Sequence, residues 1–165
     1  MYYSSMKNSI LFLLVMIGFA ACLPSNQFLQ KYYLPSHNWS YADAKEFHFT
    51  IKDTADKHKI FFLIGHTETY LNSNIWLQIF SKNPSGKVDT LDPLEVGLAL
   101  ADGHWLGNRA NKIVEHTMDI TPNGGTFSFT EKGDYTFTIK QLMRVDPLPN
   151  IEYVGLQIDK LTKKS

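Results

Sequence analysis

Apolar residues recur at every second position through most of this chain, and that period restricts the fold more than any other feature of the sequence. Phe47, Phe49 and Ile51 alternate with polar residues, and Phe137 and Ile139 repeat the pattern much later in the chain. Successive side chains of a β-strand point to opposite faces, so this alternation indicates strands with one buried face. No stretch of the mature part has a convincing helical period. Only 27–33 is compatible with a short turn.

The apolar runs are short and are separated by turn-forming residues, which favours many antiparallel strands. The turns are expected at 53–56, 83–86, 122–125 and 146–150. We expect a single antiparallel two-sheet β-sandwich, jelly-roll or Ig-like, with a closed barrel as the alternative. Tyr135 follows a glycine at the start of a strand and is expected to bond back to nearby backbone, as corner tyrosines of sandwiches do. The expected strands, eight or nine in number, are 46–52, 60–64, 75–80, 87–91, 94–100, 113–120, 127–129, 135–140 and 154–158.

The N-terminus has the pattern of a lipoprotein signal peptide. Lys7 precedes an apolar run from Ile10 to Phe19, which is short for a membrane span, and Ala20 and Ala21 lead to Cys22. The sequence predicts cleavage before Cys22 and lipid attachment to that residue. The alternative is an ordinary secreted protein with a stray thiol, since the single cysteine cannot form an internal disulfide.

This leader divides the chain into three parts. Residues 1–21 are the predicted lipoprotein signal peptide, 22–45 a lipidated tether and lead-in strand, and 46–161 the β-sandwich domain. Leu23 follows the cysteine in place of the aspartate that retains lipoproteins at the inner membrane, and no acidic cluster follows it. We therefore expect the outer membrane, with the domain facing the periplasm. Sixteen basic residues balance sixteen acidic ones, which argues against nucleic acid as a partner and leaves membrane attachment to the lipid.

The histidines give little support for catalysis or metal binding, because none has the spacing of a metal motif and no nucleophile motif accompanies them. We expect no enzyme, no metal and no cofactor beyond the lipid on Cys22. His48 and His58 are predicted to be solvent-exposed on polar strand faces, and His116 to be a core histidine bonded to backbone. A weaker hypothesis is a hydrolase that uses His66 or His104 with a nearby carboxylate.

Aromatic residues suggest a second class of function. Trp39, Trp76, Trp105 and Tyr70 would stack on sugar rings if they were exposed together, as in a carbohydrate-binding sandwich. Packing within the core or against a partner is the competing interpretation.

The most distinctive loop brackets a Trp-Leu pair with two glycines, which permit a tight excursion of the backbone. If the pair is buried, it plugs one end of the sandwich, and if it is exposed, it anchors a protein partner. The candidate partner-binding residues are Asp102, Gly103, His104, Trp105, Leu106 and Gly107.

A series of motifs makes the chain resemble the gliding motility lipoprotein family GldH of the Bacteroidota, and their order and spacing are more specific than any one of them. Two positions depart from the family pattern: His104 stands where the family usually has lysine, and Ala101 where it has proline. The matching segments are the lipobox ending at Cys22, Trp39, the opening strand 47–54, 84–87, 89–91, 101–107, 133–139, 143–144 and 151–158 with its Val154-Gly155.

The resemblance implies an envelope lipoprotein needed for gliding and for the linked type 9 secretion machinery, with a secretion or envelope role in species that do not glide. Family members are not known as enzymes, so it carries over no catalytic residue. It implies a non-catalytic scaffold that offers loops or an edge strand to other gliding or secretion lipoproteins.

Overall fold

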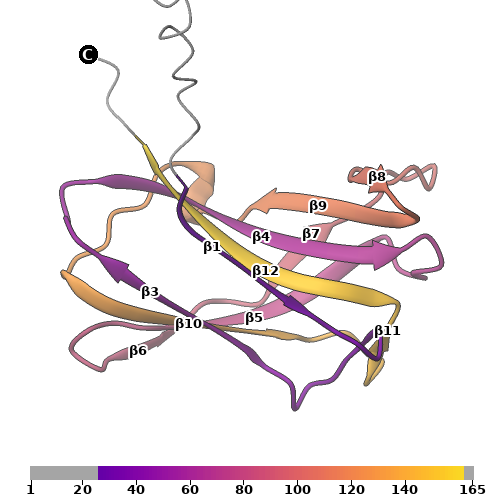
Figure 1. Ribbon diagram of the computed structural model, residues 1–165, viewed down its shortest axis with the longest axis horizontal. Coiled ribbons are helices and arrows are strands. Elements are labelled where there is room, and N and C mark those ends of the chain that lie inside the picture. The colour runs from indigo at the N-terminus through magenta and orange to yellow at the C-terminus, as the bar shows by residue number, and fades with distance from the viewer. Residues whose placement is uncertain (1–25, 162–165) are drawn as a thin grey trace, which may run out of the picture.

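The computed structural model describes residues 26–161, and two antiparallel five-stranded sheets account for most of them (Figure 1). The leader 1–21 and Cys22 lie outside the described residues. Among the described residues there is no helix of the length and apolarity that a membrane span requires. The elements are β1 (Asn26–Tyr33), β2 (Asn38–Trp39), β3 (Lys45–Ile51), β4 (Lys57–Thr67), β5 (Asn74–Lys82), β6 (Val88–Thr90), β7 (Leu94–Gly97), β8 (Asn108–Ala110), β9 (Ile113–Asp119), the 3-10 helix η1 (Pro122–Gly124), β10 (Gly133–Gln141), β11 (Leu148–Pro149) and β12 (Ile151–Leu161).

The two sheets have the strand order of a jelly roll. One sheet runs β1-β12-β4-β9-β8, and the other runs β3-β10-β5-β6 with β7 also paired to β5. Along the chain, β1 and β4 of the first sheet lead to β3 and β5 of the second, and β10 of the second sheet leads back to β12 of the first. The chain therefore crosses repeatedly between the two layers, as two Greek keys require. The predicted all-β sandwich is confirmed, and of the two sandwich types the order selects the jelly roll. The described strands form two separate sheets rather than the closed barrel considered as the alternative.

Alternating side chains of both sheets meet in one core. In β3 and β10 every second residue is buried, as the period of two predicts. Phe49 lies at the centre of an aromatic group, with its ring centroid 5.2 Å from that of Phe137 and 5.5 Å from that of Phe129. The Tyr135 hydroxyl donates to the carbonyl of Glu131 at 3.3 Å and accepts from the Glu131 amide at 3.2 Å, which confirms the predicted corner.

Several local expectations were wrong or incomplete. The segment 27–33 forms β1, which pairs with β12 over its length, so the segment expected as tether and lead-in supplies strands to the folded unit. Phe127 and Phe129 do not form a strand, because only Phe127 bridges to His58. His58 is fully buried, not exposed, since that bridge and the Phe129 ring at 5.2 Å cover it.

Strand direction gives the sandwich a proximal and a distal end. Asn26, where β1 begins, lies opposite Asp159 near the end of β12, so both termini of the described chain are at one end, the proximal end (Figure 1). The distal end is the opposite one, where β4 finishes at Thr67 and β12 starts at Ile151. An anchor that precedes β1 would hold the proximal end at the membrane and leave the distal end facing away from it.

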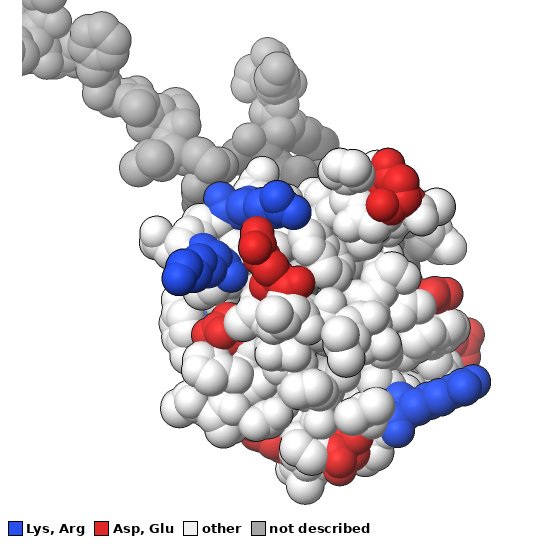
Figure 2. All heavy atoms as spheres, turned by 90° about the vertical axis from the view of Figure 1, so that its right-hand side faces the viewer, with Lys and Arg blue, Asp and Glu red and all other residues white. Residues whose placement is uncertain are grey.

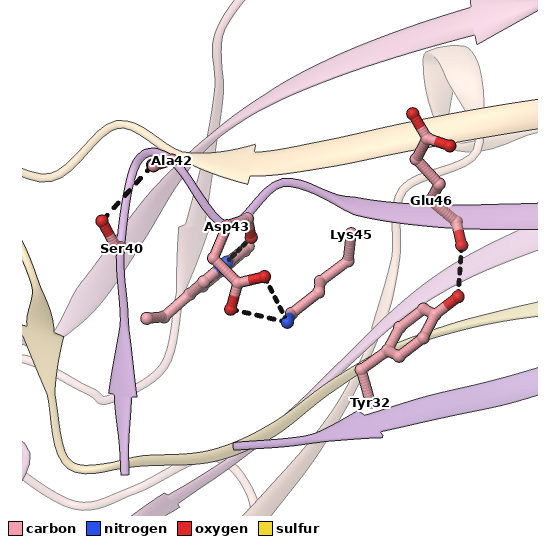
Figure 3. Close-up of polar contacts among 7 residues, drawn as sticks. Tyr32, Ser40, Ala42, Asp43, Lys45 and Glu46 are labelled. Carbon is pink, nitrogen blue, oxygen red and sulfur yellow. Dashed lines mark hydrogen bonds and ion pairs between the residues drawn. The ribbon is translucent and has the colours of Figure 1, made fainter. Parts of the chain in front are cut away.

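One lateral side of the sandwich is closed by contacts between the edge strands β1 and β3. The Tyr32 hydroxyl donates to the carbonyl of Glu46 at 2.6 Å, as Figure 3 shows, and the Tyr32 ring lies 5.2 Å from that of Phe47. In the same view Lys45 reaches the Asp43 carboxylate at 2.6 Å, which fixes the turn that leads into β3. The opposite lateral side, between β9 and β6, has no such closure within the described residues.

Candidate interaction site at the distal end

The distal end carries few charges and several exposed apolar side chains. Figure 2 views this end, and a wide central area lacks Lys, Arg, Asp and Glu, which lie mainly toward its margin. Leu71 is 88% exposed and Leu106 is 52% exposed, and Leu100 and Val145 are comparably exposed on neighbouring loops. Exposed apolar side chains gathered on a surface with few charges are typical of protein–protein interfaces.

The candidate loop belongs to a hairpin built on residues 98–106. The amide of Leu106 donates to the carbonyl of Leu98 at 2.9 Å, and the amide of Leu100 donates to the carbonyl of His104 at 2.8 Å. Gly103 turns the chain with a φ of +87°, which favours glycine. The carbonyl of Ser73 accepts from the amide of Leu98 at 2.7 Å, so this hairpin and the loop that bears Leu71 form one connected structure.

Trp105 points inward and fixes the hairpin to the body of the domain. It is partly buried, and its ring packs on the hydrophobic core. The ring centroid lies 4.5 Å from that of His66, in an edge-to-face arrangement, and 6.4 Å from that of Tyr70. The next residue, Leu106, points outward. The loop therefore combines the two predicted alternatives, burial of the pair and its exposure: Trp105 anchors the loop on the core, and Leu106 is exposed to solvent.

Beneath Trp105 lies a pair of buried histidines from adjacent strands. The Nε2 atoms of His66 on β4 and His116 on β9 are 2.9 Å apart. The carbonyl of Thr67 can only accept, so His66 donates from Nδ1 to it at 2.7 Å, and its Nε2 must then accept from His116 when both rings are neutral. This leaves Nδ1 of His116 as a buried acceptor without a hydrogen-bond partner among the described residues. His116 is a core histidine as predicted, but its bond is to another histidine and not to backbone.

Gly107 lets the chain pass directly over this pair. A Cβ atom at Gly107 would lie 2.5 Å from the carbonyl oxygen of Glu115 and 2.8 Å from the ring of His116. Side chains do not approach backbone so closely, and any other residue would therefore push the loop away from β9. The second glycine of the loop thus serves close packing, whereas Gly103 serves the turn.

The remaining predicted residues of the loop lie in solvent. Nδ1 of His104 is 3.2 Å from a carboxylate oxygen of Asp102, and both side chains are exposed. The same carboxylate accepts from the His104 amide at 3.1 Å, which is the local bond of an aspartate turn. These two residues therefore shape the tip of the hairpin.

The four aromatic residues considered for sugar binding do not form a common exposed row. Trp39 and Tyr70 are buried in the core and Trp105 is partly buried, whereas Trp76 is 38% exposed. Trp76 lines a separate groove of about 490 Å³ on the outer face of β5. The residues that line this groove are Asn72, Asn74, Trp76, Leu142, Met143, Arg144 and Val145.

The histidines considered for hydrolysis lie in different surroundings. Both ring nitrogens of His66 are engaged, by Thr67 and by His116, and neither contacts a carboxylate. His104 has Asp102 beside it, but on an open turn. Glu68, which follows His66 closely in sequence, pairs with Arg109 at 3.4 Å. In the part of the chain that the structure describes, no cluster of three or more His, Cys, Asp or Glu side chains is arranged to hold a metal ion.

The sequence did not single out Leu71, Leu100 or Val145, which belong to the same end. An isolated apolar residue in a loop is common, and only the fold brings the loops that carry these three to the same end as Leu106. A usable signal was present in the turn-rich segments around them, since loops at one end of a sandwich converge.

Acidification is expected to destabilise the domain through the histidine pair. Burial, and secondarily the charge of His66, lowers the pKa of His116 to about 4, and burial also lowers the pKa of His66. The unfolded chain therefore binds more protons than the folded one below about pH 6.5. The contribution of the neutral pair to the free energy of unfolding is fully present above that pH and is lost as the pH drops toward 4. We expect a loss of about 1–2 kcal/mol at pH 5, or roughly 3–8 °C in Tm, measurable by thermal unfolding.

Two variants locate the source of this pH dependence. His116→Leu should flatten the fall in Tm between pH 7 and pH 5, whereas His48→Gln, on an exposed strand face, should leave it unchanged. An equal fall in wild type and His116→Leu would show that the pair does not cause it.

Solved structures offer only weak likenesses. The insecticidal delta-endotoxin Cry8Ea1 of Bacillus thuringiensis has a TM-score of 0.34 at 7% identity, and the match covers 76% of this chain but only 20% of that one. Latent PorU of Porphyromonas gingivalis has a TM-score of 0.35 at 10% identity, with 87% of this chain and 14% of that one covered. The K1 adhesin domain of Lys-gingipain, from the same organism, has 0.31 at 9% identity, with 80% of each chain covered. TM-scores this low carry no functional argument.

Sequence comparison is more specific. A curated relative from Christiangramia forsetii, described as a gliding motility lipoprotein GldH homolog, is 27% identical over 157 residues, which cover 91% of this chain and 93% of the relative. The family described as GldH lipoprotein matches residues 27–158, from the second residue of β1 almost to the end of β12. This chain belongs to the GldH lipoprotein family.

Proposed function

We propose that this protein is a non-catalytic scaffold of the envelope machinery for gliding motility and type 9 secretion, anchored by lipid on Cys22. It sits at the outer membrane, faces the periplasm, and binds other gliding or secretion lipoproteins through its distal end. Family membership supports the lipoprotein and gliding parts of this proposal. The exposed apolar side chains of Leu71, Leu100 and Leu106, on loops joined through Ser73 and Leu98 at an end with few charges, support the binding part.

The way in which the distal end is built also supports a docking role. Leu106 is presented by a hairpin whose neighbouring residues are fixed, through Trp105 on the core and Gly107 on His116. A rigid presentation lowers the entropy that binding must remove, so more of the contact energy appears as affinity. Apolar side chains held in this way are the kind of residue that dominates an interface.

Capture of the protein from crosslinked cells tests the docking surface. A C-terminally tagged copy carrying Leu106→Asp should recover at least ten times less of the envelope lipoproteins that wild type recovers, because a charge placed at the centre of an apolar contact must be desolvated. The matched control is Leu29→Asp, since Leu29 is also exposed and apolar but lies midway along β1, away from the distal end. Equal recovery with both variants would contradict the proposal.

A second candidate function, a lipid-anchored carbohydrate-binding module, is favoured by the groove beside Trp76. The exposed indole offers a stacking face, the polar side chains of Asn72 and Asn74 line the groove, and Arg144 makes no ion pair within the described residues. Glycan recovery in the same capture experiment, lost in Trp76→Ala and retained in Leu106→Asp, would favour this function over the scaffold.

A further inference from the structure

The lateral side between β9 and β6 contains an apolar cleft that reaches into the sandwich. Its volume is about 220 Å³. The floor consists of core residues from three strands, Ile60, Ile79 and Phe137, and the mouth includes Ser81 and Asp89. An apolar cavity of roughly 150 Å³ accepts a benzene molecule, so this one has room for one aromatic or two small aliphatic side chains. The full lining is Ile60, Ile79, Ser81, Asp89, Leu91, Ile120, Pro122, Phe127 and Phe137.

One rim of the cleft is a free strand edge. β8 covers β9 only from Ile113 to Glu115, and no other described strand pairs with the outer edge of β9. The amide of Ile120 donates toward β4, to Ile60 at 2.9 Å. Backbone groups alternate in direction along an antiparallel strand, so the amides of Thr117 and Asp119 point away from β4 and toward solvent. The strand thus offers a short row of hydrogen-bonding groups beside the apolar cleft.

The other rim is a free edge as well. The amide of Leu91 donates to the carbonyl of Ile79 at 3.0 Å, so by the same alternation Thr90 and Val88 direct their backbone groups outward. β6 pairs only with β5 among the described strands, and its side chains are exposed. An apolar cleft flanked on both sides by unpaired backbone fits an occupant that has a backbone of its own, because a lipid or a small apolar molecule would leave these groups unmatched.

The charges at the rims are already neutralised. Lys59 lies 2.5 Å from the Asp119 carboxylate on one rim, and Lys87 lies 2.8 Å from the Asp89 carboxylate on the other. Neither of these two carboxylates is left without a lysine, so they do not select a basic segment, and an uncharged one fits best.

We propose that the cleft receives an extended, uncharged segment of a partner protein, which adds to the outer edge of β9 and inserts an apolar side chain between the sheets. Strand addition of this kind gains affinity from main-chain hydrogen bonds and specificity from pockets for alternate side chains. The free length of β9 from Thr117 to Asp119 corresponds to about three paired residues of an added strand. This second surface is independent of the distal end and goes beyond the scaffold proposed above.

A tethered strand tests the cleft even while the partner is unidentified. The full chain is extended after Ser165 by a Gly/Ser linker and eight residues in which Val and Phe alternate with Thr. Leu161 pairs with Lys57, and β4 adjoins β9, so a strand added beyond β9 lies three strand spacings, or about 15 Å, from β12 across the sheet. A short linker gives a millimolar effective concentration, which compensates for a weak intrinsic affinity. Hydrogen exchange at Thr117 and Asp119 should slow at least tenfold, and Tm should rise.

Three controls make this result specific. The same tail with its apolar residues contiguous should give no protection, because its apolar and polar side chains would no longer lie on opposite faces of the added strand. Thr117→Pro removes an outward N–H but no bond to β4, and should abolish the protection, whereas Thr117→Val should keep it. If Thr117→Pro does not fold, Ser81→Phe, which fills the mouth of the cleft, replaces it and should have the same effect.

The proposal is overturned if the alternating tail protects neither amide, or if both tails protect equally. A final arm uses the native assembly captured from crosslinked cells. Protection of Thr117 and Asp119 there supports the strand site, and free exchange of both amides in an intact assembly overturns it. In that last case the scaffold proposal still stands, because it rests on the distal end.

Discussion

Replacing Cys22 by alanine is expected to move the protein from the membrane fraction to the soluble periplasm almost completely. Two or more acyl chains are needed for stable anchoring, and each buried methylene contributes about 0.8 kcal/mol, so loss of the residue proposed to carry the lipid should leave no comparable attachment. The chain should also lose its function. The variant is made behind an ordinary secretory leader, because an uncut lipoprotein leader would hold the chain in the inner membrane.

The same variant should remain folded, since the contacts that hold β1 to β12 begin at Asn26. Fractionation and thermal unfolding of the same preparation check both statements, and intact mass of the wild type reports the lipid. A soluble Cys22→Ala protein that supports full function would refute the need for anchoring. One that stays with the membrane would show that another part of the chain binds it.

Trp39→Ala is expected to have the largest effect on stability. Trp39 is fully buried, its Nε1 donates to the carbonyl of Asp43 at 2.8 Å, and its own carbonyl accepts from Gln141. Truncation of a buried tryptophan costs about 3–5 kcal/mol, which is a large part of the ~5–15 kcal/mol that a domain of ordinary stability has. Denaturant unfolding measures the loss.

Trp76→Ala is the matched control, because the same change is made at a side chain that is 38% exposed. It should cost less than about 1 kcal/mol. Similar losses for the two variants would contradict the placement of Trp39 in the core. The contrast also matters for function, because a sugar-binding role for Trp39 would require it to be accessible.

The β-sandwich followed from the sequence because the period of two is a local property, which each strand carries in its own residues. The choice of jelly roll over Ig-like order did not, since strand order depends on pairings between segments far apart, such as β1 with β12. A lead-in strand was expected within 22–45, but its position was missed, because polar residues break the pattern in 27–33 and this segment was expected as a short turn. Among the described strands β1 is an edge strand that pairs with β12 alone, so its sequence carries a weaker signal than a central strand such as β4.

The candidate loop was found from its glycines and its Trp-Leu pair, but the division of roles within it was not. Only the fold shows that Trp105 lies over His66 and that Gly107 lies on His116. The pairing of two histidines fifty positions apart has no local signature. His58 was misjudged for a related reason: its burial comes from Phe127 and Phe129, which approach from a segment without regular structure.

The most direct test of the scaffold is secretion by cells whose protein is anchored and folded but has a charged distal end. We would measure type 9 cargo in the medium of cells that carry Leu71→Asp together with Leu106→Asp, at wild-type abundance in the membrane. The account predicts that secretion falls to the level of cells without the gene, while cells with Leu29→Asp secrete normally. Normal secretion by the double variant would contradict a role for the distal end.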